Sequence, residues 1–463
     1  MPTLSLVHRL RFVFAALLAL LLVVSAVADD VKQTDTYRRI KSSIDAVRSI
    51  DTHEHLCSEA DMTQDSPDIL QDLFNWYTTA DLKTAGASQV AIERLTDKKN
   101  PDLRARFNGI KDAWERTKHT GYGEATRLVA QHVYGIMEIT AEAIETAAPK
   151  AAELNKSGER KRILKEIGNI DHVQIDNFCW PCLPDPGGVD FFLYDLSWMG
   201  FTCGDANLAE LHTETGVQVK DLPTLREGMA AIFAKYGPQA IAVKSQAAYQ
   251  RTLLWQERSE ADVARALNKT VNGLDLSGEE KLCLGDWCWA RGAELAAQYN
   301  LPFKIHTGYL AGNGNMVIDP VRAAHLSELI RCHPQTCFVL MHTAYPYGGE
   351  LAAMAKHYAN VYVDLCWAWS IDPHSTTDFV HRMIHTVPAH KLFLFGGDTY
   401  WPNAAVAFAI QARAGLTRAL QSEIDQGQLT EREAIALATR FMQGNQRECF
   451  DIEGVRSRLT TAG

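Results

Sequence analysis

The sequence predicts an α/β protein, a (β/α)8 barrel of the TIM type with a helical insertion after its first strand. Apolar runs that resemble buried strands alternate with helical segments, which is typical of parallel βαβ units. About eight such runs can be distinguished, and this number favours a closed barrel over an open sheet. Several runs end in a polar residue, as strands do where a barrel builds a site at their carboxyl ends.

The strand-like runs can be followed in order along the chain. They are VRSID (47–51), HVQID (172–176), FFLYDL (191–196), AIAVK (240–244), PFKIH (302–306), CFVLMH (337–342), VYVDL (361–365) and LFLFGG (392–397). Helical segments such as LPTLREGMAAIFAKYG and GGELAAMAKHYAN separate most of them. We therefore expect buried parallel strands joined by helical crossovers.

The stretch between the first and second strands is unusually long. Residues 60–170 are mostly helical in pattern, and about a hundred residues exceed what a simple crossover needs. We expect an insertion that caps the barrel mouth or packs beside it. Residues 403–463 are predicted to form C-terminal helices outside the barrel. The insertion and these helices are expected to belong to one barrel domain that spans residues 29–463.

Residues 1–28 have the pattern of a signal peptide. Arg9 and Arg11 give a basic start, residues 12–24 are apolar, and an Ala-Val-Ala cleavage pattern occupies 26–28. We expect an exported protein, periplasmic or secreted. The alternative is an uncleaved membrane anchor, although the apolar stretch is short for a bilayer span.

The charge balance limits the class of partner. The chain has 46 basic and 56 acidic residues, a net charge of −10, which argues against nucleic acid or an anionic membrane as a partner once the signal is removed. We expect a small-molecule substrate, and the sequence leaves a homo-oligomer open.

Ten cysteines are present, and in an exported protein some could pair. Cys332 and Cys337 bracket a short loop, and Cys179 and Cys182 form a C-x-x-C motif among prolines. No second pair completes a zinc motif, so local disulfides or free thiols are favoured.

Four residues at strand ends predict a metal site. His53 and His55 share one face of the first strand, because side chains alternate along a strand. Imidazole and carboxylate are the usual donors for zinc and related ions, so we expect His53, His55, His306 and Asp398 to bind a divalent metal. Zinc is the expected ion, with manganese or another divalent ion as the alternative. An open position would hold a water whose pKa the ion lowers.

Two further strand-end residues leave alternatives open. His342 is predicted to be either a second-metal ligand or the catalytic group that orients the water, so one or two ions are expected. A core histidine bonded to a backbone carbonyl is the alternative for His342 and His306. A buried Lys244 needs a partner. It could bind a substrate carboxylate, become a carbamate that bridges two metals, or form a structural ion pair.

Aromatic and basic residues near the same strand ends suggest a substrate pocket. Arg251 follows Lys244 by seven residues and could extend toward the same pocket. The aromatic residues predicted to form a substrate-binding wall are Tyr309, Tyr345, Trp367 and Trp401.

These motifs resemble the amidohydrolase superfamily, in its amidohydrolase-related branch. The segments that carry the resemblance are DTHEHL, AVKSQAAYQR, PFKIHTGY, VLMHTAYPYGGELAAMAKHYANVYVDL and GGDTYWP. They are similar to the amidohydrolase-type domain of nodulin-type and fungal sporulation proteins that is fused to glutamine-synthetase-like domains. The resemblance implies a (β/α)8 barrel, a divalent metal on His53, His55, His306 and Asp398, a catalytic His342, and Asp398 as general base and then acid.

Two functions follow from the resemblance. The first is an exported metal-dependent hydrolase that uses a metal-activated water on an amide or related C–N or C–O bond of a small substrate. The alternative is a non-hydrolytic isomerase or decarboxylase that acts on a carboxylate such as a uronate, with Lys244 and Arg251 as carboxylate clamps.

Overall fold

A computed structural model describes residues 34–462 of the chain. The signal peptide predicted over residues 1–28 lies outside these residues. Among the helices of 34–462, none combines the length and the apolar character needed to cross a bilayer.

Parallel strands form the centre of the molecule. A three-stranded sheet has the order β1-β2-β3 and a six-stranded sheet the order β4-β5-β6-β7-β8-β9, with every neighbouring pair parallel. The strands are β1 (Ser49–Glu54), β2 (Ile170–Ile175), β3 (Phe192–Tyr194), β4 (Leu196–Ser197), β5 (Val243–Ser245), β6 (Phe303–Ile305), β7 (Phe338–Met341), β8 (Val361–Asp364) and β9 (Leu392–Phe393). The strand order and the intervening helices confirm the predicted barrel class.

Backbone hydrogen bonds join the two sheets. β3 and β4 are one strand position interrupted at Asp195, whose N–H donates to Ile175 O at 2.8 Å, while the next N–H, of Leu196, donates across to Ala242 O at 2.8 Å. On the other side, the N–H of Thr52 donates to Phe395 O at 3.1 Å. The strand segments therefore occupy eight positions in the order that the sequence predicts.

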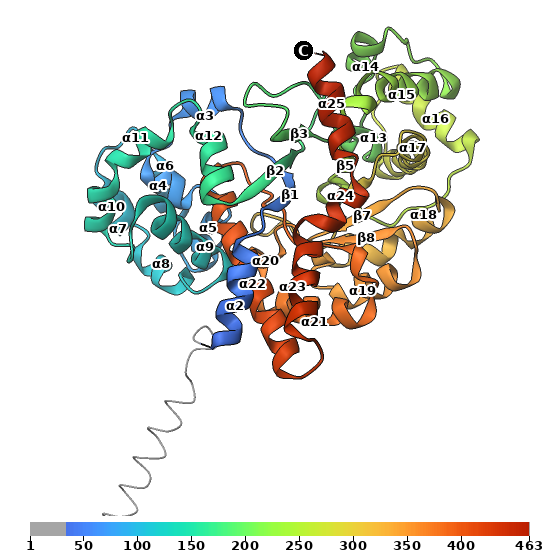
Figure 1. The fold of residues 1–463 in the computed structure, drawn as a ribbon. Helices are drawn as coiled ribbons and strands as arrows, with labels where there is room; N and C mark the ends of the chain where they lie inside the picture. Colours follow the sequence, from blue (N-terminus) through green and yellow to red (C-terminus); the bar gives the residue numbers. More distant parts are fainter. Residues whose placement is uncertain (1–33, 463) are drawn as a thin grey trace, which may run out of the picture.

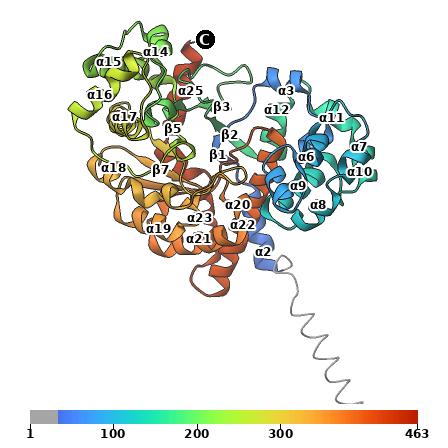
Figure 2. The same ribbon diagram turned by 180° about the vertical axis from the view of Figure 1, so that it is seen from behind.

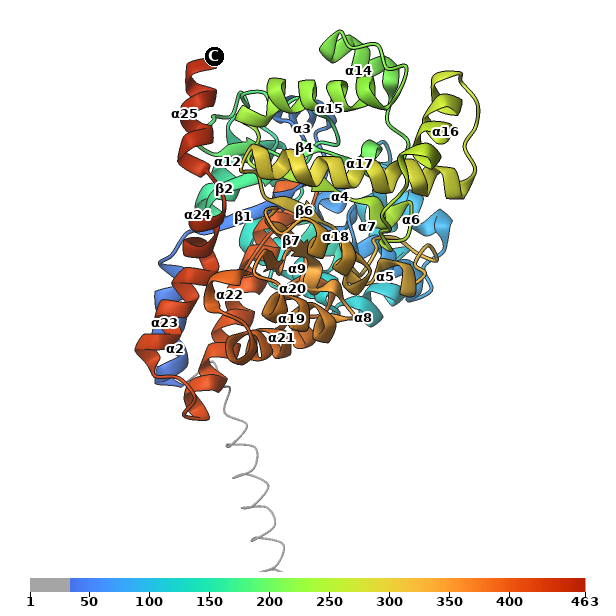
Figure 3. The ribbon, with the colours of Figure 1, turned by 90° about the vertical axis from the view of Figure 1, so that its right-hand side faces the viewer.

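Helices surround this centre. The crossovers contain α13 (Met199–Thr202), α14 (Leu208–Thr215), α15 (Leu222–Tyr236), α16 (Glu260–Val271), α17 (Gly278–Gln298), α18 (Ser327–Cys332), α19 (Gly348–His357), α20 (Ala368–Ile371) and α21 (Pro373–Thr386). Local sequence sets their starts: Ser277 and Glu280 form a capping box that begins α17, the long helix near the top of Figure 3.

The stretch between β1 and β2 is helical. It contains α3 (Glu59–Asp65), α4 (Ile69–Phe74), α5 (Thr78–Thr84), α6 (Gln89–Thr96), α7 (Leu103–Asn108), α8 (Lys111–Thr117), α9 (Gly121–Val129), α10 (Ala141–Ala147), α11 (Pro149–Leu154) and α12 (Glu159–Arg162), with π-helical turns at Ala130–Tyr134 and Ile163–Ile167. Figures 1 and 2 show these helices as a lobe beside the barrel. Trp76 packs against Phe408, with ring centroids 5.6 Å apart, so the lobe shares its core with the barrel.

Helix α2 and the helices that follow β9 pack around the rest of the barrel. α2 (Asp35–Asp45) and α22 (Pro402–Asp425) lie at the junction with the lobe, followed by α23 (Glu431–Thr439), α24 (Asn445–Cys449) and α25 (Ile452–Ala462). Four apolar residues of the last segment pack against strand residues of the barrel interior: Phe450, Ile452, Val455 and Leu459. We call these four residues the C-terminal plug. The tail therefore does more than cover the outside, because the plug fills one end of the barrel.

Candidate metal centre

Five of the predicted site residues converge around one carboxylate. Oδ1 of Asp398 lies 3.2 Å from Nε2 of His53 and 3.3 Å from Nε2 of His55. Its Oδ2 lies 3.7 Å from Nε2 of His342, which in turn lies 2.9 Å from Nδ1 of His306. Strand ends or the loops directly after them supply all five side chains, which is why residues so distant in sequence meet at one end of the barrel.

The five residues form two overlapping donor sets. His53, His55 and Asp398 make one, and His306, His342 and Asp398 make the other. Within each set, one donor atom per residue lies within 4.8 Å of the others. Donors bound at about 2 Å to one tetrahedral ion are about 3.3 Å apart, so the His53 and His55 contacts to Asp398 are already close to that spacing. The residues present fit a divalent metal, with Asp398 common to both sets.

The outer nitrogens of two histidines are held by backbone carbonyls. Nδ1 of His55 lies 2.6 Å from Asp176 O, and Nδ1 of His342 lies 2.9 Å from Cys366 O. A proton held on Nδ1 by such a carbonyl leaves Nε2 unprotonated and directed at Asp398. The backbone contact expected of a core histidine is therefore present at His342, where it also directs Nε2 toward Asp398.

The other two histidines are oriented differently. Nε2 of His306 lies 2.8 Å from Tyr309 O, so its Nδ1 faces the cluster. Nδ1 of His53 lies 3.8 Å from Oδ2 of Asp195 and has no hydrogen-bond partner among the described residues. Asp195 is itself bound by the buried Lys304 at 2.8 Å. Burial alone would raise the pKa of Asp195, but Lys304 holds that pKa below its ordinary value.

Burial sets the charge of the donors. It lowers the pKa of His342 to about 4 and that of His306 well below its ordinary value. Burial alone would raise the pKa of Asp398, but its interactions with His53 and His55 hold it well below the ordinary value. Near neutral pH His306 and His342 are therefore neutral imidazoles and Asp398 is an ionised carboxylate, which are the forms that bind metal.

The backbone around Asp398 is tightly constrained. Asp398 has φ 57°, a left-handed conformation, and its N–H donates to His53 O at 2.9 Å. The hydroxyl of Tyr77 donates to its carbonyl oxygen. A Cβ at Gly397 would lie 1.9 Å from Oε1 of Glu54, so glycine is needed for the close approach predicted before Asp398. Such strain is typical of functional sites.

Lys244 lies inside the cluster. Its Nζ is 2.9 Å from Nε2 of His53, and its side chain is fully buried. Burial lowers the pKa of Lys244, while Asp176 and Asp398 oppose that shift. Lys244 forms no salt bridge with any residue that the structure describes, so the structural ion pair that the sequence left open has no partner here.

Arg251 does not extend toward this pocket, so that expectation is corrected. Its guanidinium pairs with Asp286 of α17 at 2.5 Å and donates to Thr202 O at 3.1 Å. After Gln246 the chain forms a 3-10 turn over Ala247–Tyr249, and Arg251 follows this turn and is directed to α17. Its guanidinium instead ties this loop to α17.

The predicted aromatic wall is only partly assembled. The ring of Trp367 lies 5.5 Å from His342 and 5.7 Å from Tyr309, and Tyr345 lies 6.1 Å from Tyr309. Trp401 lies apart, in a small cluster with Cys57 and Met62. Tyr309, Tyr345 and Trp367 thus remain as candidate substrate contacts, and Trp401 packs elsewhere.

Three residues of the site were missed by sequence reasoning. Nε2 of Gln246 contacts Nε2 of His55, and Phe178 stacks on the same imidazole with centroids 4.5 Å apart and planes at 9°. Gln246 follows Lys244 by two positions, so strand alternation could have found it. Phe178 and Tyr77 come from a loop and from the lobe, where no periodic pattern marks them.

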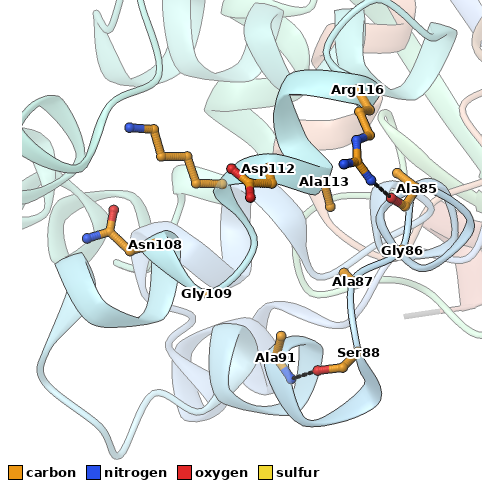
Figure 4. Close-up of a pocket in the computed structure, with 11 residues that line it drawn as sticks. Ala85, Gly86, Ala87, Ser88, Ala91, Asn108, Gly109, Asp112, Ala113 and Arg116 are labelled. Carbon is orange, nitrogen blue, oxygen red and sulfur yellow. Dashed lines mark hydrogen bonds between the residues drawn. The ribbon is translucent and has the colours of Figure 1, made fainter.

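A surface hollow of about 610 Å³ lies in the lobe (Figure 4). It is lined by segments 85–91 and 108–116, and none of the donor residues lines it. Arg116 bridges its two sides by donating to Ala85 O at 2.9 Å. This hollow is separate from the candidate metal centre.

Parts of this chain are similar to known proteins. The amidohydrolase family described as Amidohydro_2 matches residues 250–437. Protein fluG of Emericella nidulans is 25% identical over 226 residues, which are 46% of this chain and 26% of that protein. The chain thus matches about a quarter of the length of that curated relative.

Solved structures share the fold. Uronate isomerase from Thermotoga maritima has a TM-score of 0.71 at 14% identity, covering 90% of this chain and 97% of that one. Glucuronate isomerase from Caulobacter crescentus has a TM-score of 0.73 at 16% identity, covering 91% and 94%. At such identities the likeness supports the barrel architecture alone. The match of residues 250–437 and the similarity to protein fluG support a relation of this chain to the amidohydrolase family.

Proposed function

We propose that this chain is a metal-dependent hydrolase that cleaves an amide or related C–N or C–O bond of a small substrate. The observation that carries the proposal is the pair of donor sets that share Asp398, with Lys244 beside them. A divalent ion in this position would act as a Lewis acid and would lower the pKa of a coordinated water. Zinc is the expected ion, on His53, His55, His306 and Asp398.

Asp398 is proposed as the proton-transfer group. Its carboxylate is ionised and is held in place by two histidines and a strained backbone. It would accept a proton from the attacking water and return it to the leaving group. His342 is neutral, and Cys366 O fixes its ring with Nε2 toward Asp398, so it can orient the water or the scissile carbonyl.

Lys244 is proposed to take part in metal binding. A cationic lysine touching the metal-facing nitrogen of His53 would repel a divalent ion, and burial already favours the neutral amine. A neutral amine can add CO2 and lose a proton to form a carbamate. The resulting carboxylate would contribute a donor to both sets and would allow two ions.

A second function has separate support. An isomerase or decarboxylase that acts on a carboxylate such as a uronate is favoured by the likeness to two uronate isomerase structures over 90% and 91% of the chain. In this case Lys244 would remain an ammonium and bind the substrate carboxylate. Arg251 would not assist, because it pairs with Asp286.

A substrate panel separates the two functions. Purified protein loaded with zinc or with manganese is incubated with N-acyl amino acids, lactones and uronates, and NMR follows the products. Release of an amine or opening of a lactone supports hydrolysis, and conversion of a uronate to its keto form supports isomerisation. Asp398→Asn serves as the inactive control. Isomerisation or decarboxylation without hydrolysis of any panel member would overturn the first proposal.

A further inference from the structure

Two cysteines from distant parts of the chain meet at the plugged end of the barrel. Cys337 directly precedes β7, and Cys449 ends α24, just before Phe450 of the plug. Their Sγ atoms lie 3.6 Å apart although 112 positions separate them in sequence. Both residues are partly buried. A disulfide bond is about 2.05 Å long. Side-chain rotations that bring the two sulfurs about 1.5 Å closer together would therefore allow the bond to form.

The residues around Cys337 and Cys449 show which parts of the molecule a disulfide bond would connect. Cys337 and Cys449 both border the apolar cluster in which the C-terminal plug packs against strand residues such as Val339 and Phe393. The ring of Phe450 lies 5.5 Å from that of Phe393. Side chains alternate along β7, so Cys337 shares the inward face of Val339. A bond between the two sulfurs would tie the plug to a central strand.

The plug also supports the layer beneath the metal centre. Nζ of Lys304 lies 5.2 Å above the ring of Phe450 and binds Asp195 at 2.8 Å. Asp195 in turn faces Nδ1 of His53 at 3.8 Å. A plug that stays in place therefore keeps Lys304 packed under the site.

In the other candidate pairs the two sulfurs do not contact each other in the described structure. Sγ of Cys332 lies 3.7 Å from a carboxylate oxygen of Glu328. In the C-x-x-C motif, Sγ of Cys179 contacts Asn177, and Sγ of Cys182 contacts the carbonyl of Trp180. All ten cysteines are free thiols, one of the two outcomes expected from the sequence, and the sulfurs of Cys337 and Cys449 meet across a long separation in the chain.

We propose that Cys337 and Cys449 are an oxidation site that forms a disulfide staple between β7 and the C-terminal plug. The oxidant is a small-molecule disulfide such as oxidised glutathione. The thiolate of Cys337 attacks it, forming a mixed disulfide and releasing one glutathione. The thiolate of Cys449 then attacks the sulfur of Cys337 and releases the second glutathione. Two protein thiols become one disulfide, and their two protons and two electrons reduce one glutathione disulfide to two thiols.

The test uses the purified chain, fully reduced and then equilibrated with oxidised and reduced glutathione. Thiols are counted in denaturant, peptides are mapped by mass spectrometry without reduction, and melting is followed with and without reductant. We expect two fewer thiols than the ten of the reduced chain, and one linked peptide pair that contains Cys337 and Cys449. Closing so long a loop should raise the melting temperature by about 5 °C.

Matched variants make the result specific. Cys337→Ser and Cys449→Ser should each abolish the linked peptide pair and the reductant-dependent change in melting. Cys332→Ser should keep both, because its sulfur contacts Glu328 instead. A Cys332–Cys337 link, a chain that keeps all ten thiols, or glutathione adducts without the linked pair would each overturn the proposal.

Discussion

Nζ of Lys244 lies 2.9 Å from Nε2 of His53, the same nitrogen that faces Asp398 at 3.2 Å. An ammonium in this position donates to Nε2 and occupies the lone pair that a metal needs. Metal binding and the state of Lys244 are therefore coupled. Before an ion can bind Nε2 of His53, Lys244 must stop donating to this nitrogen. It can do so by losing its charge or by moving away.

Lys244→Ala tests this coupling. If Lys244 carries a bridging carbamate, the variant should lose one of two ions per chain, and a short carboxylic acid should partly restore activity. If Lys244 clamps a substrate carboxylate, metal content should not change and KM should rise strongly. Elemental analysis and kinetics separate the two results.

Lys391→Ala is the matched control for that experiment. Lys391 is also buried, but its ammonium donates to Ala355 O at 2.9 Å, away from the metal centre. The control should lose stability while keeping its metal and its KM. An equal effect of both variants on stability, with metal content and KM unchanged, would contradict both roles of Lys244.

Tyr77→Phe should weaken the support of Asp398. The variant removes the hydroxyl that donates to Asp398 O, a hydrogen bond whose loss costs about 1 kcal/mol. We expect a lower melting temperature and a several-fold fall in kcat/KM, because the left-handed backbone of Asp398 is less constrained. Tyr122→Phe is the comparison: Tyr122 packs 5.5 Å from Tyr77, and its buried hydroxyl lacks a hydrogen-bond partner in the described structure. It should be neutral or stabilising, and an equal loss in both variants would count against a specific role of Tyr77.

Stability of the metal-free protein should fall in mild acid. Burial lowers the pKa of His342 to about 4, whereas an unfolded histidine titrates near about 6.5. Between these pH values the unfolded chain binds a proton that the folded chain does not, so the free energy of unfolding decreases as pH falls from 7 toward 4. This group alone contributes about 3 kcal/mol.

Denaturant unfolding in the presence of a chelator at several pH values checks this dependence. The His342→Gln variant should show a smaller loss between pH 7 and pH 4 than the parent protein. Identical pH profiles for the two proteins would show that His342 does not titrate in this way.

Asp398→Asn should abolish turnover and leave the fold intact. An amide cannot accept the proton and is a poor metal ligand. Circular dichroism and melting should stay close to those of the parent protein, while product formation in the substrate panel should disappear. Turnover at the parental rate would show that another group performs the proton transfer.

The barrel could be predicted because its signals are local. Buried parallel strands are continuous apolar runs, and the point at which each run ends places His306 and Asp398 on one rim. His53 and His55 follow from strand alternation. The structure brings these residues together around Asp398, while their binding of a metal stays a prediction.

Features that depend on tertiary packing could not be predicted. Arg251 lies near Lys244 in sequence, but the turn over Ala247–Tyr249 directs it to Asp286. Tyr77 reaches Asp398 only because the lobe packs beside the barrel, and no periodic pattern reports that packing. Domain boundaries and export follow from composition and length, and they stay predictions.

Metal content per chain is the most direct test of the site around Asp398. We predict that protein refolded or dialysed with zinc retains one or two ions per chain by elemental analysis, and that His55→Ala and Asp398→Ala each lose at least one. Glu423→Gln serves as the comparison, because Glu423 contacts His381 and His385 and belongs to neither donor set. It should retain the full metal content. Equal metal content in all four proteins, or loss only in Glu423→Gln, would contradict a metal centre at Asp398.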